Sequence, residues 1–455
     1  MSTIPARSRA SPSGLRIVPD IPICQQDLPL DWYQEEFRPY AEEYLALPDR
    51  LPGTVLPWMD RYIEPALGHF GSSLMLLAHY YMGGEIVKLV ERYGGRIADS
   101  YELALQAVDH PETKIFVESA VHFMAESIAI LAADDQEVWI TNPKSGCTLE
   151  MLAKDWMVEP AYDELRARYG EELLVVAYMN TSGRVKALAG ETGGAVCTSS
   201  NAKAIVRWAL AQDRKILFVP DRHLGENVAA AAGLGPNELF LWGGGHEGAR
   251  RRIADLPPAE VKALDAAKMI LWGSWCGVHT VFRPEHVAWW QDRGWRVLVH
   301  PECPKEVVDA ADGAGSTKFL WNAVMNAERG ERIAIGTEGH FVRNAREQGR
   351  LRGVEVANLA DIPDEKFASM GCGCATMSRN DPPHLVAILD LLRRGTPPDL
   401  NHVLPGDVVH EVTGDRHRLP ERERRELARN AKAALTRMIE ITKAAEPPRG
   451  APSSR

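Results

Sequence analysis

The sequence predicts an α/β protein made of three modules with parallel sheets, and three features of its pattern support this prediction. Short continuous apolar runs end in polar or glycine-rich turns, as in ELLVVAYMNTS at 172–182, which is typical of buried parallel strands. Helical stretches follow these runs, and in EIVKLVERY at 85–93 the apolar residues recur at helical spacing. The strand-turn-helix units fall into three successive groups, at about 71–155, 171–235 and 268–345.

These groups divide the chain into domains and extensions. The expected segments are an N-terminal extension at 1–70, a first α/β domain at 71–156, a second at 157–267 that includes an inserted segment at 236–267, a third at 268–395, and a charged C-terminal extension at 396–455. The last segment contains a charged amphipathic helix. We expect this helix to lie solvated on the surface, with contact to RNA or to an acidic protein as the alternative.

The composition is that of an ordinary globular protein, with 45% hydrophobic and 25% charged residues. The 52 lysines and arginines are outnumbered by 62 acidic residues, which argues against a general nucleic-acid binder. No apolar run reaches the roughly 18–20 residues that span a bilayer. Because the first residues lack the apolar stretch of a signal peptide, we expect a cytoplasmic protein whose seven cysteines are reduced thiols, catalytic groups or metal ligands.

Three cysteines stand in similar settings far apart in the sequence. Cys147 ends NPKSGC after an expected strand, Cys276 lies in WGSWCGVH at another strand end, and Cys374 lies in MGCGCATMSRN before an expected helix. Their thiolates could converge at one central site, where three ligands would leave one iron of a four-iron cluster open. Buried cysteines without a metal are the alternative, because such cysteines are common.

Polar residues at other strand ends suit proton transfer and anion binding. The candidates for proton transfer are His79, Tyr81, Tyr178, His279, His300 and Glu302. The candidates for anion binding are Ser199, Asn201, Ser316 and Thr317, beside a glycine-rich turn at 313–315. By residue type alone, all of them could equally be structural, in turns, helix caps or hydrogen-bonded core positions.

Several motifs occur in a fixed order from about residue 71 to 394. They are AHYY, ADSYELA, VHFMAES, NPKSGC, AYMNTS, CTSSNA, PDRHLG, WGSWCGVH, HPEC, GAGST and CATMSRN. The ordered set resembles the quinolinate synthase family, type A. The resemblance implies three three-layer α/β/α domains with parallel sheets, related by pseudo-threefold symmetry around a central active site.

The resemblance also implies a [4Fe–4S] cluster held by Cys147, Cys276 and Cys374, with one open iron. Cys374 is preferred to Cys372 because the family pattern Cys-x-x-Met-x-x-Asn is matched from Cys374 to Asn380. On this interpretation Cys372 is structural or a redox neighbour.

The implied reaction condenses iminoaspartate with dihydroxyacetone phosphate, loses phosphate and two waters, and forms quinolinate for de novo NAD biosynthesis. The implied catalytic residues are Glu302 as general base, His300, Tyr81, His79, Tyr178 and His279. The implied substrate-binding residues are His79, Ser100, Tyr178, Asn180, Ser199, His300, Glu302, Ser316 and Thr317. The expected partners are these small molecules and, functionally, an enzyme that produces iminoaspartate, with no nucleic acid and no membrane.

Some residues depart from the family's usual pattern. Tyr80 and Met82 stand where asparagine and glutamine are common, which puts substrate positioning around His79 in question. Two alternatives remain open: another [4Fe–4S] hydro-lyase acting on a different small acid, and a non-catalytic, cluster-bearing redox sensor. A sensor needs only the cysteines, so retention of the histidines, tyrosines and Glu302 argues against it.

Overall fold

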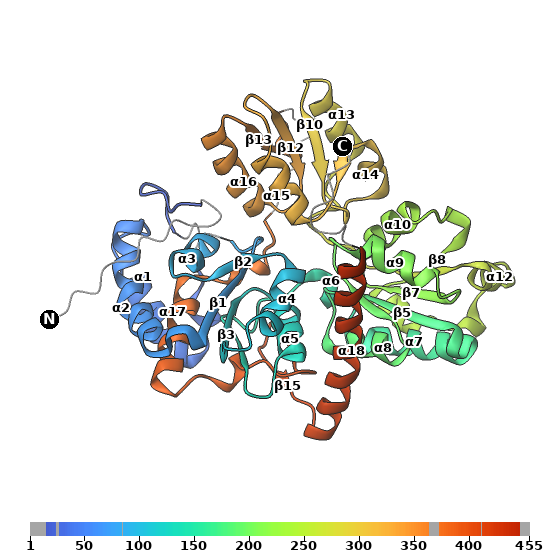
Figure 1. The fold of residues 1–455 in the computed structure, drawn as a ribbon, viewed down its shortest axis with the longest axis horizontal. Coiled ribbons are helices and arrows are strands. Elements are labelled where there is room, and N and C mark those ends of the chain that lie inside the picture. Colours follow the sequence, from blue (N-terminus) through green and yellow to red (C-terminus); the bar gives the residue numbers. More distant parts are fainter. Residues whose placement is uncertain (1–14, 24–26, 84, 364–372, 411, 446–455) are drawn as a thin grey trace.

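Three parallel β-sheets form the framework of the protein in a computed structural model, which describes residues 15–23, 27–83, 85–363, 373–410 and 412–445. Figure 1 shows the sheets, each with its own helices, as three units around a common centre. The predicted fold class is therefore confirmed: the strands that were expected from continuous apolar runs are buried between helices and pair in parallel. No helix within the described residues is both long and apolar enough to cross a membrane.

The first unit contains a four-stranded sheet with the order β2-β1-β3-β4. Its strands are β1 (Leu74–His79), β2 (Arg96–Ala98), β3 (Ile115–Ser119) and β4 (Glu137–Ile140). Its helices are α3 (Ile86–Arg92), α4 (Ser100–Asp109), α5 (His122–Leu131) and α6 (Thr148–Met151). The Asp99 carboxylate accepts a hydrogen bond from the Glu102 backbone N–H at 3.0 Å, so α4 begins directly at the end of β2.

The second unit contains a five-stranded sheet with the order β6-β5-β7-β9-β8. Its strands are β5 (Leu173–Tyr178), β6 (Ala195–Cys197), β7 (Lys215–Val219), β8 (Leu239–Gly243) and β9 (Met269–Trp272). Its helices are α7 (Asp155–Tyr169), α8 (Gly183–Glu191), α9 (Ala202–Leu210), α10 (Arg222–Ala231), α11 (Gly245–Arg250) and α12 (Pro258–Ala266).

Two strands of this sheet differ from the expected organisation. The segment 236–267, expected as an insertion, supplies the edge strand β8. The strand β9, expected to open the third domain at residue 268, lies between β7 and β8, where Leu271 pairs with Phe218 on one side and Leu241 on the other. An apolar run predicts a buried strand but does not specify its neighbours, and the second sheet therefore extends as far as Trp272.

The third unit contains a four-stranded sheet with the order β11-β10-β12-β13. Its strands are β10 (Arg296–Val299), β11 (Gly313–Ala314), β12 (Arg332–Gly336) and β13 (Glu355–Asn358). Its helices are α13 (Pro284–Gln291), α14 (Lys305–Ala310), α15 (Thr317–Met325) and α16 (Gly339–Arg352). Gly353 ends α16 with a φ of +74°, a left-handed conformation that favours glycine.

The N-terminal extension packs on the first unit together with a helix from far along the chain. Its main helices are α1 (Arg38–Leu45) and α2 (Pro52–Phe70), and α17 (Pro382–Arg394) lies against both. The Tyr33 and Tyr40 hydroxyls donate hydrogen bonds to Asp381 and Asp390, and the latter bond is 2.7 Å long. Although α17 was expected within the third domain, it packs against α1 and α2, and most of its residues are buried.

The C-terminal extension also packs against the rest of the protein. A short antiparallel pair, β14 (Val408–Val409) and β15 (Arg416–His417), precedes the long helix α18 (Glu421–Ala445). Figure 1 shows α18 between the first and second units, where it contacts α5, α8 and α9. The expectation of a solvated surface helix was wrong, because one face of α18 is buried. The buried residues are Leu427, Ala431, Ala434, Leu435, Met438 and Ile439.

Candidate active site

A pocket lies where the carboxyl ends of strands from all three sheets meet, as expected for parallel α/β units. β1 ends at His79, β5 ends at Tyr178, and the turn after β10 carries His300 and Glu302. All six predicted catalytic residues and all three predicted ligands line it. The lining residues are His79, Tyr81, Asp99, Ser100, Met124, Cys147, Thr148, Tyr178, Asn180, Thr198, Ser199, Cys276, Val278, His279, His300, Glu302, Thr317, Glu338, Cys374 and Met377.

Three thiols face this pocket from separate segments of the chain. Burial and then the neighbouring Cys374 thiol raise the pKa of Cys147. Burial, the charge of Glu302 and the two other thiols raise the pKa of Cys276. All three cysteines line the same pocket. Cys147 is buried and the other two are partly exposed toward the pocket. Grouped thiols are the donor set that an iron–sulfur cluster takes, and the metal would displace their protons.

The described residues bring no fourth cysteine to the pocket lining. Cys197 and Cys303 are both buried and outside it, as small apolar groups would be. Cys372 lies outside the described residues, so the preference for Cys374 rests on the sequence pattern and on the position of Cys374 in the pocket wall. Asn180 supports the thiol group, because its side-chain amide lies 3.8 Å from the Cys147 sulfur.

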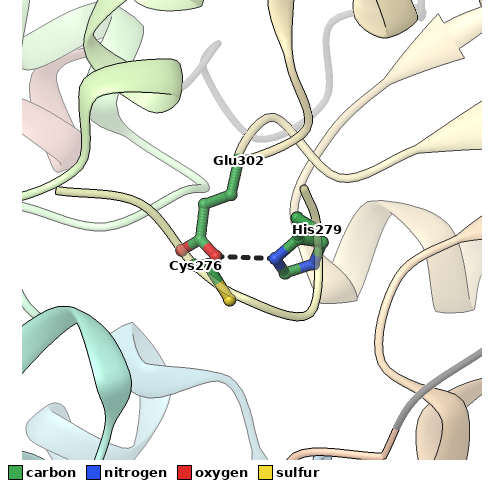
Figure 2. Close-up of side chains that lie close together, drawn as sticks. All are labelled: Cys276, His279 and Glu302. Atoms are coloured by element: carbon green, nitrogen blue, oxygen red, sulfur yellow. Dashed lines mark ion pairs between the residues drawn. The ribbon is translucent and has the colours of Figure 1, made fainter. Parts of the chain in front are cut away.

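Glu302 and His279 lie beside Cys276, and Figure 2 shows the carboxylate directed at the imidazole with the sulfur next to both. The His279 Nδ1 is 2.9 Å from the Glu302 Oε2. One donor atom from each of the three residues lies within 4.8 Å of the others, so this group could also hold a metal ion. A thiol, an imidazole and a carboxylate are a donor set that suits zinc or iron.

The Glu302 carboxyl is buried and still holds its charge. Burial alone would raise the pKa of Glu302, but the interactions with His300, His279 and Tyr178 hold it at about 2. The Tyr178 hydroxyl donates to the Glu302 Oε1 over 2.5 Å. Because burial lowers the pKa of His300 to about 3, the pair titrates well below neutral pH. At neutral pH, Glu302 is therefore a carboxylate beside a neutral His300.

His79, Tyr81 and Tyr178 are neutral at physiological pH. Burial lowers the pKa of His79 to about 3, and His79 Nδ1 accepts a hydrogen bond of 3.2 Å from the Tyr81 backbone N–H. Burial, followed by the charge of Glu302, raises the pKa of both Tyr81 and Tyr178 well above its usual value. The pocket thus combines the charged Glu302 carboxylate with the neutral imidazoles of His79 and His300 and the phenols of Tyr81 and Tyr178, which can donate or accept protons.

Two helices begin at the pocket wall. Ser100 is the first residue of α4, Thr317 is the first residue of α15, and both line the pocket, as does Ser199. Helix N-termini present unpaired N–H groups and favour anions. Ser316 is the exception among the predicted substrate-binding residues, because it is absent from the lining and its hydroxyl accepts a 3.4 Å hydrogen bond from the Phe319 N–H as the cap of α15.

The sequence reasoning overlooked Glu338, a fully buried residue of the pocket wall. Its carboxylate accepts hydrogen bonds from the Cys374 backbone N–H at 3.0 Å and from the Phe341 N–H at 2.9 Å, and it lies 2.7 Å from the His340 Nδ1. Glu338 follows β12, so the rule that reactive residues gather at strand ends could have identified it. Asp99 and Thr198 also line the pocket after β2 and β6.

Tyr80 and Met82, the two residues near His79 that differ from the usual family pattern, lie outside the pocket lining. The Tyr80 ring packs against Trp321 and Phe341 of the third unit, with ring centroids 5.7 and 6.1 Å apart. Met82 is fully buried, and its sulfur lies 3.3 Å from the Asn380 amide nitrogen. Neither residue lines the pocket, whereas His79 and Tyr81 on either side of Tyr80 do.

The fold and the pocket together define an α/β enzyme whose site combines three thiols with buried acid–base groups. Residues 68–403 match the family described as quinolinate synthetase A protein. The chain is 37% identical to the quinolinate synthase of Acidobacterium capsulatum, over 88% of this chain and 95% of that protein. It is 37% identical to the one from Bacillus pumilus, over 74% and 86%, and 32% identical to the one from Corynebacterium glutamicum, over 94% and 98%.

The chain belongs to the quinolinate synthase family. Its activity is therefore quinolinate synthesis in NAD biosynthesis, and the family implies an iron–sulfur cofactor. The family match ends at residue 403, ahead of α18.

Proposed function

We propose that the protein condenses iminoaspartate with dihydroxyacetone phosphate in the pocket between the three units, and releases quinolinate, phosphate and two waters. The observation that carries this proposal is the gathering of three thiols, the Glu302 carboxylate, three imidazoles and two phenols in a single pocket. This combination matches a reaction that needs a metal centre, anion binding and several proton transfers at one place.

The residues that would hold a [4Fe–4S] cluster are Cys147, Cys276 and Cys374. When bound through three thiolates, such a cluster supplies an open iron that acts as a Lewis acid toward a departing hydroxyl group. Support for this ligand set comes from the position of the three thiols in one pocket and from the lack of a fourth cysteine among the described lining residues. Glu338 would hold the Cys374 backbone in place.

The anionic groups of the substrates would bind at the helix N-termini. Thr317 and the first turn of α15 suit a phosphate, and Ser100 with the first turn of α4 faces the same pocket. Hydroxyl and backbone N–H donors at these positions orient the phosphate and carboxylates without adding a net charge. Ser199 and Asn180 supply further donors on the side of the second unit.

Glu302 would accept protons during the condensation, since its carboxyl group is charged at neutral pH and lies among the acid–base groups of the pocket. Tyr178 remains a phenol and can return a proton to the substrate while it stabilises the carboxylate. His79 and Tyr81, adjacent to each other in the first unit, would handle the triose phosphate and its isomerisation. His300 and His279 would bind the substrate and orient Glu302.

An enzyme that produces iminoaspartate is the expected functional neighbour, because iminoaspartate is a reactive imine that hydrolyses in water. The reduced cysteines that a cluster requires favour a cytoplasmic location.

The decisive experiment is anaerobic reconstitution of the protein with iron and sulfide, followed by product analysis with both substrates. Formation of quinolinate supports the proposal. Dehydration of another small acid without condensation would favour a hydro-lyase, and a cluster that responds to oxidants without any turnover would favour a redox sensor.

The ligand set has its own test. Cys374→Ala should abolish cluster assembly, whereas Cys372→Ala, two residues away, should retain normal iron content and the visible absorbance of the cluster. The opposite result would overturn the choice of Cys374.

A further inference from the structure

Thr337 is a fully buried residue directly after β12. Its hydroxyl lies 2.8 Å from the Tyr81 hydroxyl and 3.0 Å from the His279 Nε2. Tyr81 comes from the first unit, whereas His279 follows the last strand of the second sheet. One threonine hydroxyl of the third unit therefore connects two groups that line the pocket from different sides.

Tyr81 and His279 have no direct hydrogen bond to each other in this arrangement. Their ring centroids are 6.5 Å apart, and Thr337 occupies the bridging position. The hydroxyl suits this position because it can donate one hydrogen bond and accept another. Thr337 itself is held at its backbone, where its carbonyl accepts a 3.3 Å hydrogen bond from the Asn358 side chain.

His279, which contacts the Thr337 hydroxyl through Nε2, also contacts Glu302 through its other ring nitrogen. The His279 Nδ1 is 2.9 Å from Glu302, which in turn accepts from Tyr178. The His279 ring also stacks on His300, with centroids 4.6 Å apart and an angle of 20° between the planes. His279 thus has a defined contact at each nitrogen and on one face, and Thr337 supplies the contact at Nε2.

We propose that Thr337 is a positioning residue for the condensation: its hydroxyl fixes the His279 ring and the Tyr81 hydroxyl relative to each other. Loss of the hydroxyl leaves the ring free to rotate away from Glu302 and leaves a buried tyrosine hydroxyl without its partner. The inference rests on the proposed function, since it assigns Tyr81, His279 and Glu302 to the same reaction.

Two substitutions separate the hydroxyl from the shape of the side chain. Thr337→Val keeps the shape and removes the hydroxyl, and Thr337→Ser keeps the hydroxyl and removes the methyl group. We expect Thr337→Val to lower kcat about tenfold or more with little change in KM, because the hydroxyl acts on the reacting groups rather than on substrate affinity. We expect Thr337→Ser to retain most of the activity, because it restores the bridge.

Thr192→Val is the matched control. Thr192 is also a buried threonine, but its hydroxyl bonds only to backbone groups of the second unit, at Val175, Leu188 and Ala189. This variant should lose stability and keep kcat. Iron content and visible absorbance are measured on every variant, so that a loss of cluster is distinguished from a loss of positioning.

A double-mutant cycle identifies the partner. If Thr337 acts through Tyr81, Thr337→Val should have little further effect in a Tyr81→Phe background. Normal kcat for Thr337→Val, equal losses for the valine and serine variants, or full additivity with Tyr81→Phe would overturn the inference while the wild-type protein still makes quinolinate. Failure of the wild-type protein to make quinolinate would instead overturn the proposed function.

Discussion

Two buried glutamates of this protein illustrate opposite uses of a carboxyl group. Glu302 is 3% exposed and Glu118 is 0% exposed, so burial alone does not distinguish them. The contacts with two histidines and Tyr178 hold the pKa of Glu302 at about 2 against the effect of burial. Among the described residues, neither oxygen of Glu118 has a hydrogen-bond partner, and burial raises the pKa of Glu118 well above its usual value.

The pKa values of the two glutamates shift in opposite directions because the residues lie at different positions relative to a strand. Glu118 lies within β3, paired in register with Leu77 and Ile140 of the neighbouring strands, where side chains from helices and strands fill the space. Glu302 lies beyond the end of β10, where groups from the three units meet. A buried acid becomes a charged functional group only where several elements bring donors to it, which in parallel α/β units happens at strand ends.

Replacement of Glu302 should produce the largest effect. Glu302→Gln keeps the shape and removes the charge, so we expect kcat to fall roughly 10²–10⁴-fold, the usual contribution of general acid–base catalysis. Iron content and the visible absorbance of the cluster should remain normal, because the three thiols are intact. Steady-state quinolinate formation under anaerobic conditions measures the loss.

Glu118→Gln is the matched control for this experiment. It makes the same chemical change in an equally buried carboxyl and should leave kcat near the wild-type value. Near-normal turnover of Glu302→Gln, or an equal loss in both variants, would contradict the distinction between the two glutamates.

Removal of the Tyr178 hydroxyl should have the next largest effect. Tyr178→Phe deletes one donor to the charged Glu302, and a hydrogen bond to a charged group contributes about 1.5–3 kcal/mol. We therefore expect kcat to fall by about 10–100-fold, a smaller loss than for Glu302→Gln. If Tyr178→Phe had wild-type kcat at full iron content, the hydroxyl would not be what stabilises the carboxylate.

The strand pattern predicted most of the fold and most of the pocket. The residues that lead into the pocket, such as His79 and Tyr178, could be recognised because each ends a continuous apolar run. The neighbours of each strand or helix could not be predicted, because an apolar run carries no information about what packs beside it. For this reason β9 was expected in the wrong unit, and α17 was expected away from the first unit on which it packs.

Supporting residues were harder to predict than residues of the pocket wall. Thr337 and Glu338 follow an expected strand, but their roles depend on contacts with Tyr81, His279 and Cys374, which are distant in the sequence. The buried face of α18 was overlooked for a similar reason: its many charged residues suggested a solvated helix, whereas the apolar residues at helical spacing are covered by α8.

Glu118→Gln should also change how stability depends on pH. Above the unfolded-state pKa of about 4.5, the unfolded chain releases the proton of Glu118 while the folded protein keeps it. The folded state then binds more protons than the unfolded state, so the free energy of unfolding falls as pH rises, by about 1.4 kcal/mol per pH unit while the folded carboxyl stays protonated.

Glutamine does not titrate, so the stability of Glu118→Gln relative to the wild-type protein should increase as the pH rises from 5 to 7. Denaturant unfolding of both proteins at the two pH values measures the difference. A constant difference across this range would mean that Glu118 ionises in the folded protein and has found a partner.

The smallest effect is expected at the edge of the site, where support comes from α18. The Asn201 side chain accepts a 2.7 Å hydrogen bond from the Thr198 N–H, and it donates a 2.9 Å hydrogen bond to the Thr442 hydroxyl. Thr198 and the adjacent Ser199 line the pocket. Through Thr442 and Asn201, α18 therefore helps to hold this part of the pocket lining in position.

Thr442→Val should therefore raise KM about two- to fivefold, equivalent to about 0.5–1 kcal/mol, and leave kcat unchanged. Thr436→Val, on the exposed side of the same helix, is the control and should change neither constant. A change in kcat rather than KM would show that α18 affects the reacting groups themselves. Identical constants in both variants would restrict α18 to a structural role.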